Sequence, residues 1–205
     1  MQNNEINKKL RRFLNQDRLK ICLHPYNEKC DGKIIKAHSI QKNRILNSLA
    51  IDGKVIKLSF DASDIEFSIK MEEIGIAIAT TFSGFCEKHD KLLFQPIEDL
   101  DYQLGNEKQN ALFAFRALAK ELYSKSQVVK SLQKEITANP NHHPILDYSL
   151  QGNLMGLRDL HNKWVNLSDK LLNEQYNKIV TLGIVFDKEH LLSVSSALTF
   201  PYDFE

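Results

Sequence analysis

Apolar side chains within residues 107–137 recur at steps of three and four, which is the spacing of one face of an amphipathic helix. The sequence therefore predicts a long helix over this range. The segment ANPNHHP at 138–144 ends it, because proline cannot continue a helix. Lys125 is the one break in the stripe, whose members are Ala111, Phe115, Leu118, Leu122, Val129, Leu132 and Ile136.

A second stripe with the same steps follows the proline-containing segment and predicts another helix over residues 153–174. Two apolar stripes joined by a loop of moderate length favour an antiparallel helical hairpin. We interpret both stripes as packing faces, and we expect the hairpin to hold a protein partner or a second copy of the chain. The positions of the second stripe are Leu157, Leu160, Trp164, Leu167 and Leu171.

The first 100 residues show shorter periods that are typical of a small mixed domain. Alternation and β-branched residues predict strands, whereas a basic amphipathic segment predicts a helix at the N-terminus. Ser39 is a candidate cap for a helix over 41–50, and a further helix from Asp90 is expected to stop near Pro96. The N-terminal helix covers residues 5–20, and the strands cover 33–40, 54–60, 65–71 and 74–82.

The last part of the chain is rich in Val, Ile, Leu, Thr and Phe, with the polar break DKEH near its middle. This pattern predicts a β-hairpin from residues 176–187 and 190–200. Two strands alone are marginal, so they are expected to pair with the earlier strands or with further chain. The predicted fold is α+β, with one domain over residues 1–100 and a second over 101–205 that contains both hairpins.

The composition, 42% apolar and 26% charged, is that of an ordinary globular protein. No run of about 18 apolar residues is present, and the N-terminus lacks the pattern of a secretory signal. We therefore expect a cytoplasmic protein that makes no membrane contact.

The net charge of +1 conceals an asymmetry along the chain. Residues 1–44 carry eleven Lys and Arg against four Asp and Glu, so the remainder is acidic. A basic end indicates contact with a polyanion such as DNA or RNA, although solvated lysines on a short helix give the same pattern. The candidate phosphate contacts are Lys8, Lys9, Arg11, Arg12, Arg18, Lys33, Lys36, Lys42 and Arg44.

Three cysteines are an odd number, which argues against a closed disulfide framework and favours thiols or metal ligands. Zinc prefers four thiolate or imidazole ligands in a tetrahedral array. The sequence predicts a structural Zn²⁺ held by Cys22, Cys30, Cys86 and His89. Seven residues separate Cys22 from Cys30, more than in a typical zinc knuckle, so His24 is an alternative ligand. The remaining alternative is a buried Cys86 thiol with His89 on a helix surface.

These residues resemble those of a known family. The cysteine-containing loop, the strand that ends in AHSIQ, and the segment GFCEKHD that opens a helix are similar to the zinc-stabilised treble clef of HNH endonucleases. The resemblance covers residues 22–97. The same motifs also resemble those of bacterial proteins with zinc-finger-like N-terminal parts, which by analogy suggests a defence context.

The resemblance implies catalytic roles for two residues. His38, at the strand end, is expected to act as the general base on a water that attacks the phosphodiester. Asp90 stands where the family places a histidine that holds a divalent ion, and Asp is a competent ligand for Mg²⁺. Ala37 stands where the family commonly has an acidic residue, and either Asn43 or Asn47 is available as the middle Asn.

Two functions follow from the sequence. The first is a metal-dependent endonuclease with His38 and Asp90 at its active site. The second is a binding or assembly module in which zinc is structural and the helical hairpin holds a partner. On the second reading, His38 and Asp90 are a strand-end residue and a helix-start carboxylate that favours the helix dipole.

Overall fold

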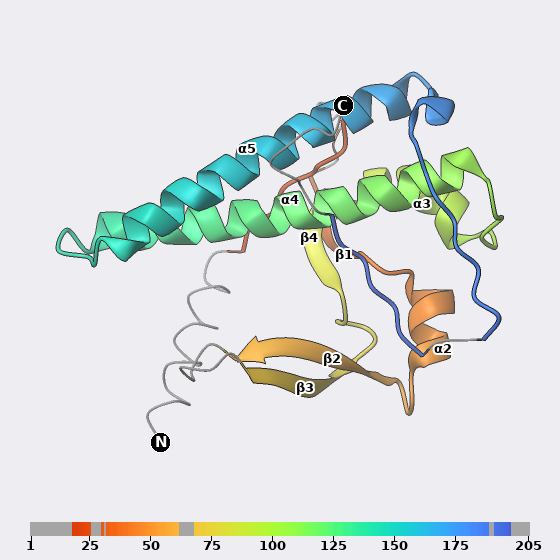
Figure 1. Cartoon of the computed structure of the whole chain (residues 1–205), viewed down its shortest axis with the longest axis horizontal. Helices are drawn as coiled ribbons and strands as arrows, with labels where there is room; N and C mark the ends of the chain where they lie inside the picture. The colour runs from red at the N-terminus through yellow and green to blue at the C-terminus, as the bar shows by residue number, and fades with distance from the viewer. Residues whose placement is uncertain (1–17, 26–29, 31, 62–67, 189–190, 198–205) are drawn as a thin grey trace.

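Two long helices dominate the computed structural model, which describes residues 18–25, 30, 32–61, 68–188 and 191–197. Helix α4 (Glu107–Ala138) and helix α5 (Ile145–Leu172) run antiparallel side by side (Figure 1). The predicted helical hairpin is therefore confirmed. Helix α5 begins eight residues earlier than expected, since Pro144 starts the helix and residues 145–152 extend it beyond the packed stripe.

A strand pair followed by a helix packs against this hairpin. Strand β1 (Ile34–His38) pairs antiparallel with β4 (Thr81–Cys86), and helix α3 (Glu87–Glu98) follows β4 directly. Helix α3 includes Pro96 and ends two residues later, at Glu98, so its expected end near Pro96 is confirmed. Its last carbonyls find side-chain donors, because Gln109 Nε2 donates to the Pro96 carbonyl and Gln41 Nε2 donates to the Glu98 carbonyl.

A two-stranded ribbon lies apart from α4 and α5, on the far side of β1 and β4 (Figure 1). It consists of β2 (Lys54–Asp61) and β3 (Ser68–Gly75), so the predicted strand over 54–60 is confirmed. The predicted strand over 74–82 is divided, because a turn at residues 76–80 separates β3 from β4. The helix expected over 41–50 is a π-helical turn, Lys42–Leu46, followed by α2 (Asn47–Leu49), without a Ser39 cap.

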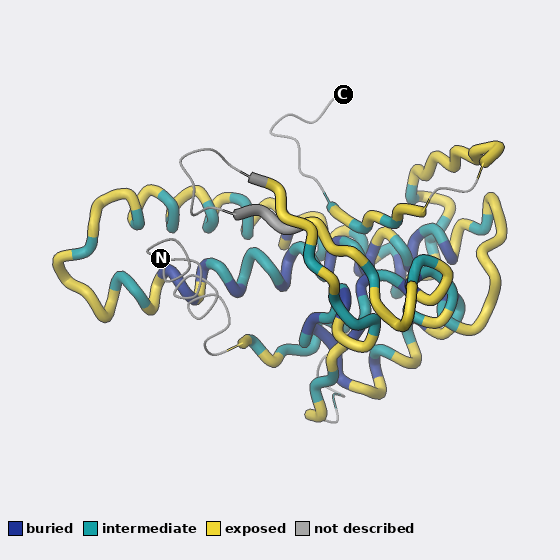
Figure 2. Tube along the Cα trace, turned by 90° about the horizontal axis from the view of Figure 1, so that it is seen from below, coloured by how far each residue is buried: buried dark blue, intermediate teal, exposed yellow. Residues whose placement is uncertain are grey.

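The hydrophobic core joins residues from both halves of the chain. Phe85 and Phe94 are fully buried and meet edge to face, with ring centroids 5.1 Å apart. Phe115 of α4, also fully buried, lies 6.4 Å from each of these rings. Figure 2 shows this burial concentrated along α4, whereas the ribbon is largely exposed. The strand pair and α3 are thus packed directly on the helical hairpin.

The predicted C-terminal β-hairpin is wrong for the residues that the structure describes. After a short 3₁₀ helix, Tyr176–Lys178 (η3), residues 179–188 and 191–197 form neither helix nor strand. Val180 and Leu182 are 99% and 87% exposed, so these apolar side chains are not buried against a sheet. Asn110 of α4 donates to the Thr181 hydroxyl at 3.1 Å and holds part of this segment beside the helix.

Most of the predicted N-terminal helix lies outside the described residues, and residues 18–20 are not helical. Among the helices that the structure describes, none combines the length and apolar character needed to cross a bilayer.

Candidate metal centre

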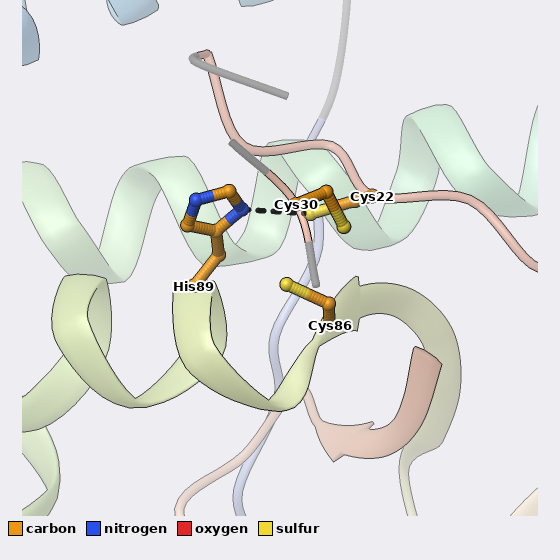
Figure 3. Close-up of side chains that lie close together, drawn as sticks. All are labelled: Cys22, Cys30, Cys86 and His89. Atoms are coloured by element: carbon orange, nitrogen blue, oxygen red, sulfur yellow. Dashed lines mark hydrogen bonds between the residues drawn. The ribbon is translucent and has the colours of Figure 1, made fainter. Parts of the chain in front are cut away.

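Three cysteines and one histidine from distant parts of the chain meet at one point. Figure 3 shows the side chains of Cys22, Cys30, Cys86 and His89 directed toward one another. One ligand atom from each lies within 4.8 Å of all the others. Cys22 Sγ and His89 Nδ1 are 3.3 Å apart. The structure therefore brings together all four residues that the sequence predicts as zinc ligands.

The junction between β4 and α3 places two members of this cluster. Cys86 is the last residue of β4 and the residue that precedes α3, and His89 lies in the first turn of the helix. The residue that precedes a helix and the third residue of that helix lie close together at the helix start, so the thiol and the ring can reach the same point. Cys86 is fully buried and His89 is 4% exposed. The site is thus built into the edge of the core.

Backbone pairing places Cys22. Its neighbours are bonded to β4, because Ile21 N donates to the Ser83 carbonyl at 3.3 Å and Leu23 N donates to the Gly84 carbonyl at 2.8 Å. Gly84 is required there, since a Cβ atom would lie 2.4 Å from the Phe82 ring. The segment around Cys22 therefore runs beside β4 toward Cys86.

A second anchor lies upstream of this segment. The Tyr123 hydroxyl of α4 donates to the Leu19 carbonyl at 3.0 Å, and Leu19 N donates to Gln127 Oε1 at 2.8 Å. The helical hairpin thus fixes the chain that carries Cys22 before it reaches the cluster.

The distance between Cys22 Sγ and His89 Nδ1 suits a tetrahedral zinc ion. Zn–S bonds of about 2.3 Å and Zn–N bonds of about 2.0–2.1 Å put two sulfurs about 3.8 Å apart, and a sulfur and a nitrogen about 3.6 Å apart. The distance between Cys22 Sγ and His89 Nδ1 is within a few tenths of an ångström of the second value. Three thiolates and one imidazole are also donors that zinc prefers. These residues could hold a metal ion such as zinc.

His24 lies beside the cluster without being one of its four members. Its ring stacks on that of His89, with centroids 4.1 Å apart and planes inclined by 16°. The structure therefore favours the set of three cysteines with His89 over the alternative in which His24 replaces a cysteine. The stacked ring of His24 restricts the rotation of the His89 ring. His24 thus helps to orient a candidate ligand and is not itself one.

His38 is found at the end of β1, as the sequence predicts, and is half-buried. Its Nδ1 atom lies 3.5 Å from the Thr80 hydroxyl. Burial lowers the pKa of His38 from its ordinary value. A hydrogen bond to the backbone of Ala79 opposes this fall, and the positive charge of Lys42 adds to it. The imidazole is therefore neutral at neutral pH.

Asp90 lies in the first turn of α3 beside a charged pair that the sequence did not reveal. Arg116 of α4 is 2% exposed, and its Nη1 lies 2.6 Å from Glu98 Oε1. Burial raises the pKa of Asp90 to about 6, while the Arg116 charge opposes this rise. Arg116 directly follows the stripe residue Phe115, so a sequence pattern alone places it toward solvent.

The described residues contain no second group of metal-ligating side chains that includes His38 or Asp90. An arginine beside Asp90 also disfavours a divalent cation there, because the two positive charges repel. The side chains around His38 and Asp90 thus give no support for the Mg²⁺ ion that the resemblance implies.

The candidate phosphate contacts have diverse surroundings. Lys8, Lys9, Arg11 and Arg12 lie outside the described residues. Lys33 forms an ion pair of 2.8 Å with Glu87, and Arg44 pairs with Asp101 and donates to the Asp99 carbonyl. Arg18 and Lys36 are exposed and line one cavity, and Lys42 is half-buried. Whether any of these residues binds nucleic acid stays a prediction.

Comparisons of the chain with models of known protein families, with curated protein sequences and with solved structures found no match. The side-chain arrangement of the Cys3His cluster is therefore the basis on which a function can be argued.

Proposed function

We propose that this protein is a zinc-binding module in which Cys22, Cys30, Cys86 and His89 hold a structural Zn²⁺. The observation that carries the proposal is the meeting of these four donors within 4.8 Å. A site with four protein ligands is closed, which is typical of structural zinc, whereas catalytic zinc keeps a position for water.

The surrounding fold supports a treble-clef-like arrangement. One ligand comes from a segment bonded to β4, and two come from the junction of β4 with α3. Strands β1 and β4 form an antiparallel pair directly before that helix. This order of elements agrees with the resemblance of residues 22–97 to the HNH type.

Metal analysis of the purified protein tests this proposal. We expect one zinc ion per chain, and we expect the variants Cys30→Ser and His89→Ala to lose most of it, because each removes one of four ligands. His161→Ala is the matched control, since His161 is an exposed histidine on α5. Wild-type protein without a transition metal, or a Cys30→Ser variant with full metal content, would contradict the proposal.

A metal-dependent endonuclease is the second candidate function. The favouring observation is that His38 ends the strand that pairs with β4 and is held neutral, as a general base must be. Arg116 and the raised pKa of Asp90 weigh against an ion at that carboxylate. We therefore rank this function below the structural zinc module.

A cleavage assay separates the two candidates. If the protein is an endonuclease, DNA or RNA is cut in the presence of Mg²⁺, and His38→Ala reduces the rate by about 100-fold or more, the range typical of a general base. His161→Ala serves again as the control. Equal cleavage by wild type and His38→Ala would show that His38 is not the general base. If wild type does not cleave, the endonuclease is excluded and the zinc-binding module remains as the proposed function.

A further inference from the structure

A cavity of about 590 Å³ lies between the ribbon and α4, away from the Cys3His cluster. Four basic side chains line it, and each comes from a different segment. Lys36 belongs to β1, Lys57 to β2 and Lys120 to α4, and Arg18 precedes the segment that pairs with β4. Glu121 is the one acidic residue among the described residues that line it. The fold thus gathers a local excess of positive charge.

Two of these cations are close enough to influence each other. Burial lowers the pKa of Lys120 from its ordinary value. The Glu121 carboxylate opposes this fall, and the positive charge of Lys57 makes a smaller contribution that lowers the pKa. Holding like charges together on separate elements costs free energy, and an anion between them would offset that cost.

Lys120 is also held in position by its own contacts. Its Nζ atom donates to the Ser124 hydroxyl at 2.6 Å and lies 5.9 Å from the centre of the Phe82 ring. A side chain that is already ordered loses less conformational entropy when it binds a ligand. The amino group therefore offers a partly preorganised donor at the wall of the cavity.

Hydroxyl groups and apolar surface complete the lining. Ser39, Thr80 and Thr81 contribute hydroxyls beside the basic residues, and Ile40 and Ile74 contribute apolar atoms. Phosphate oxygens accept hydrogen bonds from lysine, arginine and hydroxyl groups. The volume lies within the range of about 300–1,000 Å³ that is typical of small-molecule sites, so it exceeds what a bare phosphate fills.

We propose that this cavity binds the phosphate group of a phosphate-bearing ligand, with Lys57 and Lys120 as its principal contacts. The apolar part of the cavity accommodates the uncharged part of such a ligand, as in a nucleotide. The inference is independent of the zinc proposal and of endonuclease activity, since none of the cluster residues and neither His38 nor Asp90 lines the cavity.

Calorimetric titration of the purified 205-residue chain at low salt tests the proposal. Three probes distinguish the sources of phosphate: inorganic phosphate, a nucleoside 5′-monophosphate and a short 5′-phosphorylated oligonucleotide. We expect at least one to bind, and Lys57→Ala to weaken that binding by about tenfold, the effect of losing one charge-assisted hydrogen bond. The tightest probe identifies the ligand as a free anion, a nucleotide or a strand end.

Lys54→Ala is the matched control, because Lys54 is an exposed lysine on the same strand that does not line the cavity. We expect it to bind each probe within twofold of wild type. Lys57 is itself exposed, so its replacement leaves the fold intact, and circular dichroism checks this. The proposal is overturned if none of the probes binds, or if Lys57→Ala binds as tightly as wild type.

Discussion

If the Cys3His cluster holds a structural zinc ion, as we propose, a chelator is expected to abolish the cooperative unfolding transition of this protein or to lower its midpoint by tens of degrees. Structural zinc contributes an apparent binding free energy of about 10–16 kcal/mol, which equals or exceeds the total stability of a typical domain, about 5–15 kcal/mol. Thermal melting followed by circular dichroism, with and without chelator, measures the change.

The loss is expected to spread beyond the metal centre. Phe85 directly precedes Cys86, and it packs in one core with Phe94 of α3 and Phe115 of α4. If the junction of β4 with α3 is released, these rings lose their shared packing. Part of the near-ultraviolet signal of the folded chain should therefore disappear, whereas much of the helical signal of the hairpin is retained.

Adding back metal provides the control. Zn²⁺ is expected to restore the transition, whereas Mg²⁺ is not, because a hard cation prefers oxygen ligands to thiolates. The Cys30→Ser variant should melt like the chelated protein, and its half-buried side chain leaves little packing loss to confuse the result. An unchanged melting curve in excess chelator would show that the cluster does not hold a stabilising metal.

The helical hairpin and the metal cluster were predictable from the sequence for different reasons. The apolar stripe from Ala111 to Leu132 lies on the buried face of α4, and the spacing of apolar residues predicts such a face directly. The cluster was predictable because cysteine and histidine have few other roles beside turn residues in a chain with an odd number of cysteines. Neither inference required knowledge of which segments pair.

The sequence-based predictions failed where a segment's structure depends on contact with another segment of the chain. The apolar pattern around Val180 and Leu182 suits a strand, but a strand forms only if another strand accepts it, and sequence does not show that. The gathering of Lys36, Lys57 and Lys120 at one cavity depends on how β1, the ribbon and α4 are placed around it. Arg116 was missed similarly, since its burial results from the packing of α3 over α4.

Replacement of Arg116 by methionine is expected to destabilise the protein by about 3 kcal/mol, because breaking a buried ion pair leaves an uncompensated charge, here discounted for the partial exposure of Glu98. The guanidinium carbon also lies 4.3 Å from the centre of the Phe94 ring, and this cation–π contact is lost too. For a chain of this size the melting midpoint should fall by about 6–12 °C.

Urea denaturation of Arg116→Met, Glu98→Gln and the double variant separates charge from packing. The Nη1 atom of Arg116 lies close to Glu98 but is poorly aligned for a hydrogen bond. The Nε atom of Arg116 has no hydrogen-bond partner among the described residues. The pair is therefore held by charge and stacking, so the double variant should recover part of the loss. Arg158→Met, on the exposed face of α5, is the control and should change stability by less than about 0.5 kcal/mol. A loss in Arg116→Met no larger than in this control would mean that Arg116 does not stabilise the contact between α3 and α4.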